Sequence, residues 1–237
     1  MKVGFFDSGV GGLCVLKAFQ ELCPTVETVY LADRAHAPYG NKTPEEIRAR
    51  AEACTKALLD QGCEMIVVAC NTATGAAIDF LRARYPDIPF VGIEPAIKPA
   101  ARRSKTGIVG VLATAGTFAG RLYNETKARF AKGTTVLAVV ADDFVQFVEK
   151  WKGGKGTRKN ADIPMDAALH ARAEKMVRAK VEPLLKAGAD VIVLGCTHFP
   201  HLKGVIEEVC DGRAEVIDPS MAVARQAKRV LKERGPL

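Results

Sequence analysis

The chain alternates short, continuously apolar runs with longer segments in which apolar residues recur every three or four positions. The apolar runs are rich in Val and Ile and predict buried strands at Lys2–Phe6, Glu27–Ala32, Met65–Ala69, Phe90–Ile93, Gly107–Leu112, Thr135–Val140, Val191–Leu194 and Glu215–Ile217. The longer segments predict helices at Pro44–Gln61, Thr72–Tyr85, Thr117–Phe130, Met165–Ala187 and Pro219–Glu233. This alternation predicts an α/β protein with mainly parallel sheets.

An internal repeat divides the chain into two similar parts. Residues 58–72 and 184–198 align without a gap at an offset of 126, and each reads as a helix end, a Gly, an acidic residue, an apolar strand, a small residue and a Cys. A repeated helix–strand unit predicts two pseudo-symmetric α/β domains. We expect residues 1–95 with 207–237 to form the first domain and residues 96–206 to form the second.

The repeat singles out two cysteines as candidates for chemistry. Cys70 and Cys196 each lie one residue beyond a predicted buried strand, where ligands bind in open α/β sheets. A helix N-terminus following each strand would lower the pKa of the thiol and favour the thiolate. Two thiols on opposite sides of a small molecule could act as general base and general acid and invert a stereocentre. The alternatives are a purely structural role and a single covalent Cys nucleophile.

Composition adds limits on the compartment and on disulfides. The chain has 237 residues, of which 48% are hydrophobic and 26% charged, as in ordinary globular proteins. Its seven cysteines cannot all pair within one chain, and without a CxxC motif a thioredoxin-type site or zinc ribbon is not expected. No signal-peptide pattern precedes the first strand and no apolar run reaches bilayer length, so we expect a cytoplasmic protein with no membrane association.

Charge gives only a weak indication of an anionic partner. The net charge is +7, and part of it lies in Lys150–Asn160, which reads KWKGGKGTRKN and holds five basic residues and three glycines. A nucleic-acid patch would interleave aromatic residues within a recognisable module, whereas Trp151 stands alone. We therefore expect a solvated surface loop and no nucleic-acid binding.

Polar residues also follow other predicted strands. The Gly-rich segment Asp7–Gly12 comes after the first strand and could present backbone N–H groups to an anion or form a tight turn. Asp33–Gly40 follows the second strand and ends in the turn residues Pro-Tyr-Gly. Thr114 and Thr117 follow the strand of the second half that corresponds to the first strand.

Two histidines near the second cysteine invite a metal interpretation. Cys196, His198 and His201 lie within six residues, whereas a zinc site needs three or four well-spaced ligands. We expect no metal here. An imidazole beside a thiol instead tunes its reactivity, so His198 is expected to act on Cys196.

Taken together, these motifs resemble the glutamate racemase family, within the wider aspartate/glutamate racemase superfamily. The matching segments cover essentially the whole chain and are Asp7–Gly12, Pro38–Gly40, Ala69–Ala73, Gly92–Ala96, Ala113–Thr114 with Thr117, and Leu194–Pro200. The paired Cys-Asn-Thr and Cys-Thr-His motifs are the most specific of these. His198 favours glutamate racemase over aspartate racemase.

The resemblance implies interconversion of L- and D-glutamate without a cofactor, in a cleft between two α/β halves, to supply peptidoglycan synthesis. It implies that Cys70 and Cys196 are the two acid/base residues, that Asp7 and His198 assist them, and that Glu149 is a further catalytic residue. The substrate-binding residues would be Asp7, Ser8, Pro38, Tyr39, Gly40, Asn71, Thr72, Thr114, Thr117, Thr197 and His198. The expected partner is glutamate, and a homodimer is compatible with the resemblance.

The segment Ala141–Glu149 departs from the family pattern. Asp142 and Asp143 replace the usual Cys-Pro start, while Glu149 keeps the acidic end. Because the sequence begins directly at the first strand, we expect no need for a cell-wall-precursor activator.

Other functions remain as alternatives. An aspartate or broad amino-acid racemase would keep the fold and change the substrate. A Cys-nucleophile hydrolase or lyase would depend on one cysteine only. A non-enzymatic protein could bind a small molecule in a two-domain cleft. A pyridoxal-phosphate racemase would need a Schiff-base Lys, and no Lys stands out.

Overall fold

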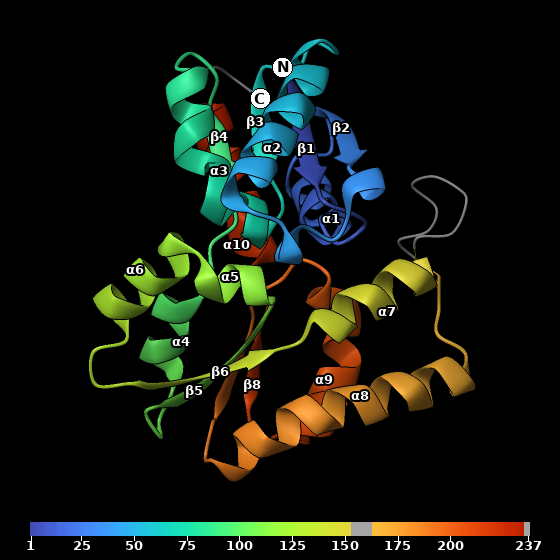
Figure 1. Cartoon of the computed structure of the whole chain (residues 1–237), viewed down its shortest axis with the longest axis vertical. Coiled ribbons are helices and arrows are strands. Elements are labelled where there is room, and N and C mark those ends of the chain that lie inside the picture. The colour runs from blue at the N-terminus through green and yellow to red at the C-terminus, as the bar shows by residue number, and fades with distance from the viewer. Residues whose placement is uncertain (153–162, 235–237) are drawn as a thin grey trace.

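Two four-stranded parallel sheets, each flanked by helices, make up the computed structural model, which describes residues 1–152 and 163–234 (Figure 1). The first sheet has the order β2-β1-β3-β4 and the second the order β6-β5-β7-β8. The strands are β1 (Lys2–Asp7), β2 (Glu27–Ala32), β3 (Met65–Val68), β4 (Phe90–Gly92), β5 (Ile108–Ala113), β6 (Thr135–Val140), β7 (Val191–Leu194) and β8 (Glu215–Ile217). The predicted α/β class with parallel sheets is confirmed.

The two strands of the repeat hold equivalent places in their sheets. β3 lies between β1 and β4, and β7 lies between β5 and β8. Every residue of both strands is buried, because helices cover both faces of each sheet. Because both faces of β3 and β7 are covered by helices, their sequences are apolar at every position.

Helices pack on each sheet in two layers. Those of the first sheet are α1 (Leu13–Leu22), α2 (Pro44–Leu59), α3 (Asn71–Arg84) and α10 (Ser220–Lys232). Those of the second sheet are α4 (Ile97–Arg103), α6 (Arg121–Phe130), α7 (Asp142–Lys152), α8 (Ala167–Lys186) and α9 (Lys203–Cys210). Short elements between the sheets are α5 (Ala115–Ala119), η1 (Arg34–His36), η2 (Tyr39–Asn41) and η4 (Phe199–Leu202).

One predicted helix is interrupted. The segment expected to be helical from Thr117 to Phe130 breaks at Gly120, whose φ of −69° and ψ of 142° are extended. The carbonyl of Gly120 accepts a hydrogen bond from the Asn124 side chain at 2.9 Å. Gly120 thereby ends α5 and starts α6, and the prediction of one continuous helix is wrong.

The C-terminal part of the chain serves both sheets. β8 pairs with β7, so residues 215–217 belong to the second sheet, although the expected boundary at residue 207 assigned them to the first domain. α10 packs against α1 on the first sheet. The division into two domains at residues 95 and 207 stays a prediction. By its pairing with β7, β8 groups with the second sheet.

Two further sequence expectations concern the loop and membranes. Lys150 to Lys152 end α7, and the rest of the expected basic loop lies outside the described residues. Within residues 1–152 and 163–234, no helix is long and apolar enough to cross a bilayer.

Candidate active site

A cavity of about 320 Å³ opens between the two halves at the carboxyl ends of their strands. Both repeat cysteines line it, together with most of the residues expected to bind substrate: Ser8, Pro38, Tyr39, Gly40, Asn71, Thr72, Thr114, Thr197 and His198. Asp7, Thr117 and Glu149 do not line the cavity. They lie behind its walls, and each bonds to a residue that does line it.

Cys70 caps the N-terminus of α3 from the first half. Its Sγ accepts a hydrogen bond from Ala73 N–H at 3.4 Å and lies 3.9 Å from Ser8 Oγ. Burial raises the pKa of the Cys70 thiol well above its ordinary value, and the nearby Asp7 carboxylate raises it further, against the Ala73 N–H. The expectation that a helix N-terminus lowers this pKa is wrong, because burial outweighs one backbone donor. Cys70 therefore rests as a protonated thiol.

Cys196 stands at the end of a chain of polar contacts in the second half. Its Sγ lies 3.7 Å from His198 Nδ1, and His198 Nε2 lies 2.7 Å from Glu149 Oε1. Burial alone would lower the pKa of His198, but its contacts with Cys196 and Glu149 raise that pKa to about 10. A cationic imidazole therefore lies beside Cys196 at neutral pH. The helix N-terminus expected after Cys196 is that of the 3-10 helix η4, and not of an α-helix.

Glu149 is held as a carboxylate by partners from both halves. Its Oε1 accepts Val10 N–H at 2.7 Å, and Arg34 Nε lies 3.4 Å from its Oε2. Burial would raise the pKa of Glu149, but the hydrogen bond and charge of His198, the Val10 N–H and Arg34 hold it below its ordinary value. The altered start of the segment at Asp142 leaves this contact with His198 in place.

The Gly-rich turn after β1 exists because the second half approaches it closely. A Cβ at Gly9 would overlap the Glu149 carboxylate, and one at Gly11 would lie 2.6 Å from His198 Nδ1 and 2.8 Å from its backbone N. The turn does present a backbone N–H to an anion, as its sequence suggests. That anion is the carboxylate of Glu149, which belongs to the protein itself.

Asp7 joins the halves beneath the cavity. Its Oδ2 accepts a hydrogen bond from Thr197 Oγ1 at 2.7 Å, and its Oδ1 accepts Gly9 N–H at 2.6 Å. Burial raises the pKa of Asp7, while the charge of His198 and the Thr197 hydroxyl act in the opposite direction. Asp7 thus fixes Thr197 next to Cys196 and places a carboxyl group near Cys70.

Hydrogen-bonding groups gather on the wall formed by α3 and α5. The hydroxyl oxygens of Thr72, Thr114 and Thr117 lie 2.9 to 3.4 Å apart. Neither the Asn71 side-chain nitrogen nor its oxygen has a partner among the described residues, although both atoms are buried. Buried polar atoms are normally hydrogen-bonded, so this wall suits a polar ligand.

Sequence reasoning missed the residues that hold Tyr39. Its hydroxyl donates to Asp33 Oδ2 at 2.6 Å, and Asp33 is also held by Arg50 at 2.9 Å and His36 at 2.9 Å. The signal was present in the segment that precedes Pro-Tyr-Gly. Further lining residues that it missed are Asn41, Ala115, Asp142, Val145 and Gln146. Of these, Asp142 was noticed only as a departure from a family pattern.

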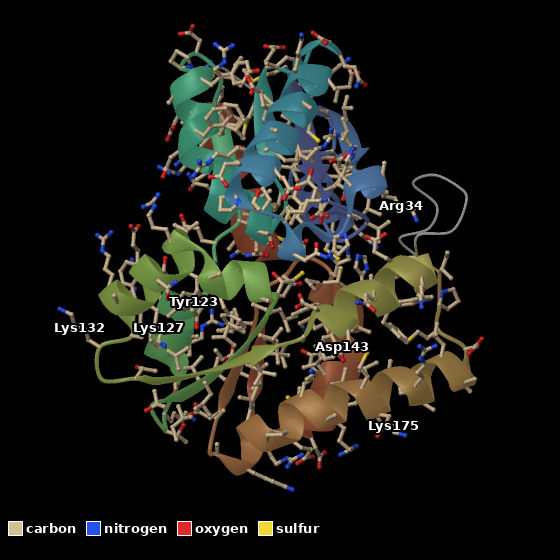
Figure 2. All side chains as sticks on the ribbon, in the orientation of Figure 1. Arg34, Tyr123, Lys127, Lys132, Asp143 and Lys175 are labelled. Atoms are coloured by element: carbon tan, nitrogen blue, oxygen red, sulfur yellow. The ribbon has the colours of Figure 1, made fainter. Side chains whose placement is uncertain are left out.

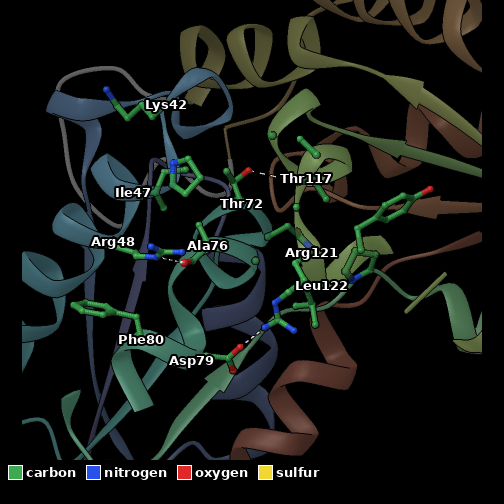
Figure 3. Close-up of a pocket in the computed structure, with 18 residues that line it drawn as sticks. Lys42, Ile47, Arg48, Thr72, Ala76, Asp79, Phe80, Thr117, Arg121 and Leu122 are labelled. Carbon is green, nitrogen blue, oxygen red and sulfur yellow. Dashed lines mark hydrogen bonds and ion pairs between the residues drawn. The ribbon is translucent and has the colours of Figure 1, made fainter. Parts of the chain in front are cut away.

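A larger cavity of about 490 Å³ adjoins the first between α3 and α6 (Figure 3). It shares Asn71 and Thr72 with the first cavity but contains neither repeat cysteine. Arg121 forms an ion pair with Asp79 on its wall. Among the described residues, no cluster of three or more His, Cys, Asp and Glu side chains could hold a metal ion.

Comparison with known proteins identifies the family. The model of the Asp/Glu/Hydantoin racemase family matches residues 14–227. The glutamate racemase of Roseiflexus sp. (strain RS-1) is 42% identical over 233 residues, which are 98% of this chain and 80% of that protein. The glutamate racemase of Pseudomonas aeruginosa is 42% identical over 237 residues, covering 99% of this chain and 83% of that protein.

Solved structures similar to this chain are also glutamate racemases. Escherichia coli glutamate racemase, in complex with L-glutamate and the activator UDP-MurNAc-ala, has a TM-score of 0.85 and 33% identity and covers 99% of this chain and 84% of its own. The Thermus thermophilus glutamate racemase, in complex with beta-chloro-D-alanine, has a TM-score of 0.74 and 34% identity over 98% of this chain and 81% of its own. The chain therefore belongs to the Asp/Glu/Hydantoin racemase family, in its group of glutamate racemases.

Proposed function

We propose that this chain is a cofactor-independent glutamate racemase in which Cys70 and Cys196 are the two acid/base residues. The observation that carries the proposal is the pair of thiols at equivalent strand ends of two similar halves, lining one cavity. The family membership and the glutamate racemases among the relatives support the same reaction. Structures of relatives with L-glutamate and D-glutamate support glutamate as the ligand.

Binding would rest on neutral donors. The unpaired Asn71 amide and the hydroxyls of Thr72 and Thr114 would hold carboxylate oxygens of glutamate, and the other predicted binding residues would complete the site. This arrangement would place the α-carbon between the two sulfur atoms. Holding the reacting groups in this geometry removes much of the entropic barrier to proton transfer.

The two sulfur atoms have different surroundings, which suits opposite roles at the start of a turnover. Cys196 Sγ lies 3.7 Å from His198 Nδ1, and Cys196 would act as the general base that takes the α-proton. Cys70 rests as a thiol and would deliver its proton to the opposite face of the α-carbon. The product is the other enantiomer, and the reverse reaction uses the same pair with roles exchanged. Asp7 would assist Cys70, and Glu149 would keep His198 protonated.

The cellular role follows from the reaction. We propose that the D-glutamate formed supplies peptidoglycan synthesis and hence cell shape, in the cytoplasm, where thiols stay reduced. The seven cysteines are free in the structure, as a thiol mechanism requires of Cys70 and Cys196. A homodimer stays a prediction, which light scattering of the purified protein checks.

Circular dichroism of D-glutamate incubated with purified protein, without added cofactor, tests the proposal. We expect the signal to decay to zero with wild type, and each of Cys70→Ala and Cys196→Ala to abolish the decay. Cys23→Ala removes a buried thiol that does not line the cavity and is the matched control, with wild-type decay expected. Near-normal racemisation by either Cys70→Ala or Cys196→Ala would contradict the two-base scheme. Faster racemisation of aspartate than of glutamate would contradict the substrate.

A further inference from the structure

Asp142 brings a carboxylate to the wall of the cavity that both repeat cysteines line. It is the first residue of α7, follows β6 at the carboxyl edge of the second sheet, and lines the cavity together with Gly40 of the first half. Its Oδ1 lies 3.4 Å from the position that a Gly40 Cβ would occupy. Among the described residues, the Asp142 carboxylate has no hydrogen-bond or ion-pair partner.

The position that a Gly40 Cβ would occupy also lies close to Thr114, one of the three threonines whose hydroxyls cluster on the cavity wall. Thr114 Cβ is 3.4 Å and Thr114 Oγ1 is 3.7 Å from the Gly40 Cβ position. Thr114 Oγ1 is therefore at most about 7 Å from Asp142 Oδ1. A ligand carboxylate oxygen that accepts a hydrogen bond from Thr114 then lies within roughly 10 Å of the Asp142 carboxylate, a distance at which like charges still repel.

No Lys or Arg side chain on the described cavity wall neutralises the charge of Asp142. The described lining contains no Lys and no Arg, and its one cationic group is His198, which is engaged with Cys196 and Glu149. Asp142 is thus an uncompensated anion facing a cavity that, by the proposed function, takes an amino acid with two carboxylates.

We propose that Asp142 is a specificity-determining residue that disfavours ligands with a second carboxylate beside Gly40. The inference rests on the proposed function and deepens it. Asp142 weakens glutamate binding by repulsion, and this penalty is absent for an amino acid of the same length with a neutral side chain, such as glutamine. The chemistry of proton transfer at the two thiols is unaffected.

Asp143 provides a matched control. It carries the same charge in the same first turn of α7, but its carboxylate lies 3.7 Å from Lys180 Nζ on α8 and does not line the cavity (Figure 2). Replacing either residue with Asn changes the net charge equally and removes the same favourable interaction with the helix N-terminus. Only Asp142→Asn removes charge from the cavity.

The test compares wild type, Asp142→Asn and Asp143→Asn by the KM and kcat of racemisation and by calorimetric affinity for D-glutamate and for L-glutamine. For Asp142→Asn we expect the KM and Kd of glutamate to fall about three- to tenfold at low salt, with kcat within twofold. The gain shrinks in high salt, because screening weakens the repulsion in the wild type. Glutamine affinity and all parameters of Asp143→Asn stay at wild-type values.

Several outcomes would overturn the assignment. An unchanged or raised glutamate Kd in Asp142→Asn contradicts it, as does an equal gain in Asp143→Asn, which would assign the effect to net charge or to the helix. The Kd is a binding constant and can be measured even if the wild type does not racemise glutamate. Such a failure would refute the proposed function but would leave the test of Asp142 intact.

Discussion

Replacing Glu149 with Gln isolates the charge that keeps His198 protonated. The carboxylate lies 2.7 Å from His198 Nε2 and accepts Val10 N–H at 2.7 Å, and Gln retains its shape while losing its charge. Hydrogen bonds between charged partners contribute about 1.5–3 kcal/mol. Since about 1.4 kcal/mol corresponds to a tenfold change in rate, we expect kcat to fall roughly 10- to 100-fold.

The pH profile gives a second, independent readout of the same substitution. With Glu149 present, the pKa of His198 is raised from 6.5 to about 10, so the imidazolium persists through neutral pH. In Glu149→Gln the pKa of His198 falls toward its ordinary value, so the alkaline limb of kcat moves to lower pH. Circular dichroism progress curves with D-glutamate between pH 6 and pH 10 measure both effects.

The control for this substitution is an exposed carboxylate with a similar ion pair. Glu174 pairs with Arg178 at 2.7 Å on α8, and such surface pairs contribute only about 0–1 kcal/mol. Glu174→Gln is expected to keep wild-type kcat and pH dependence. If Glu149→Gln kept kcat within twofold of wild type and the same alkaline limb, the role given to the Glu149 charge would be refuted.

Three other predictions concern how the halves are joined. Thr197→Val removes the 2.7 Å hydrogen bond to the buried Asp7 carboxylate, and we expect the free energy of unfolding in urea to fall by about 1–3 kcal/mol. Gly116→Ala places a Cβ 2.7 Å from the Gly40 carbonyl oxygen, so α5 must move away from η2; we expect a raised KM and a lowered melting temperature. Because folding raises the pKa of His198 from 6.5 to about 10, its stabilisation is complete below pH 6.5 and is lost as pH rises through about 10; the urea midpoint should fall over that interval, and His198→Asn should flatten the fall.

The fold was predictable wherever burial left a continuous apolar signal. β3 and β7 are buried on both faces, so their sequences are uniformly apolar and their repeat is visible. The short helices α4 and α9 carry too few turns for a clear period and were not predicted. The break at Gly120 depends on the extended backbone there and on a bond from Asn124, neither of which a periodicity reports.

The site was predictable in its residues more than in its electrostatics. Chain spacing placed Cys70 and Cys196 at equivalent strand ends, and both line one cavity. The predicted direction of the Cys70 pKa shift was wrong because that pKa depends on burial and on the Asp7 carboxylate, which the pairing of β1 with β3 brings close to Cys70. The placement of Asp142 on the cavity wall likewise depends on how α7 meets Gly40, and spacing along the chain carries no such information.

Racemisation of L-glutamate in D2O tests the central claim most directly. If Cys70 and Cys196 serve opposite faces, the α-proton goes to one sulfur and the product receives a solvent-derived deuteron from the other. We predict that D-glutamate formed at early times carries deuterium at the α-carbon, while the remaining L-glutamate carries protium. Transfer of the substrate's own proton into D-glutamate, or deuterium entering L-glutamate as fast as D-glutamate forms, would contradict the two-base account.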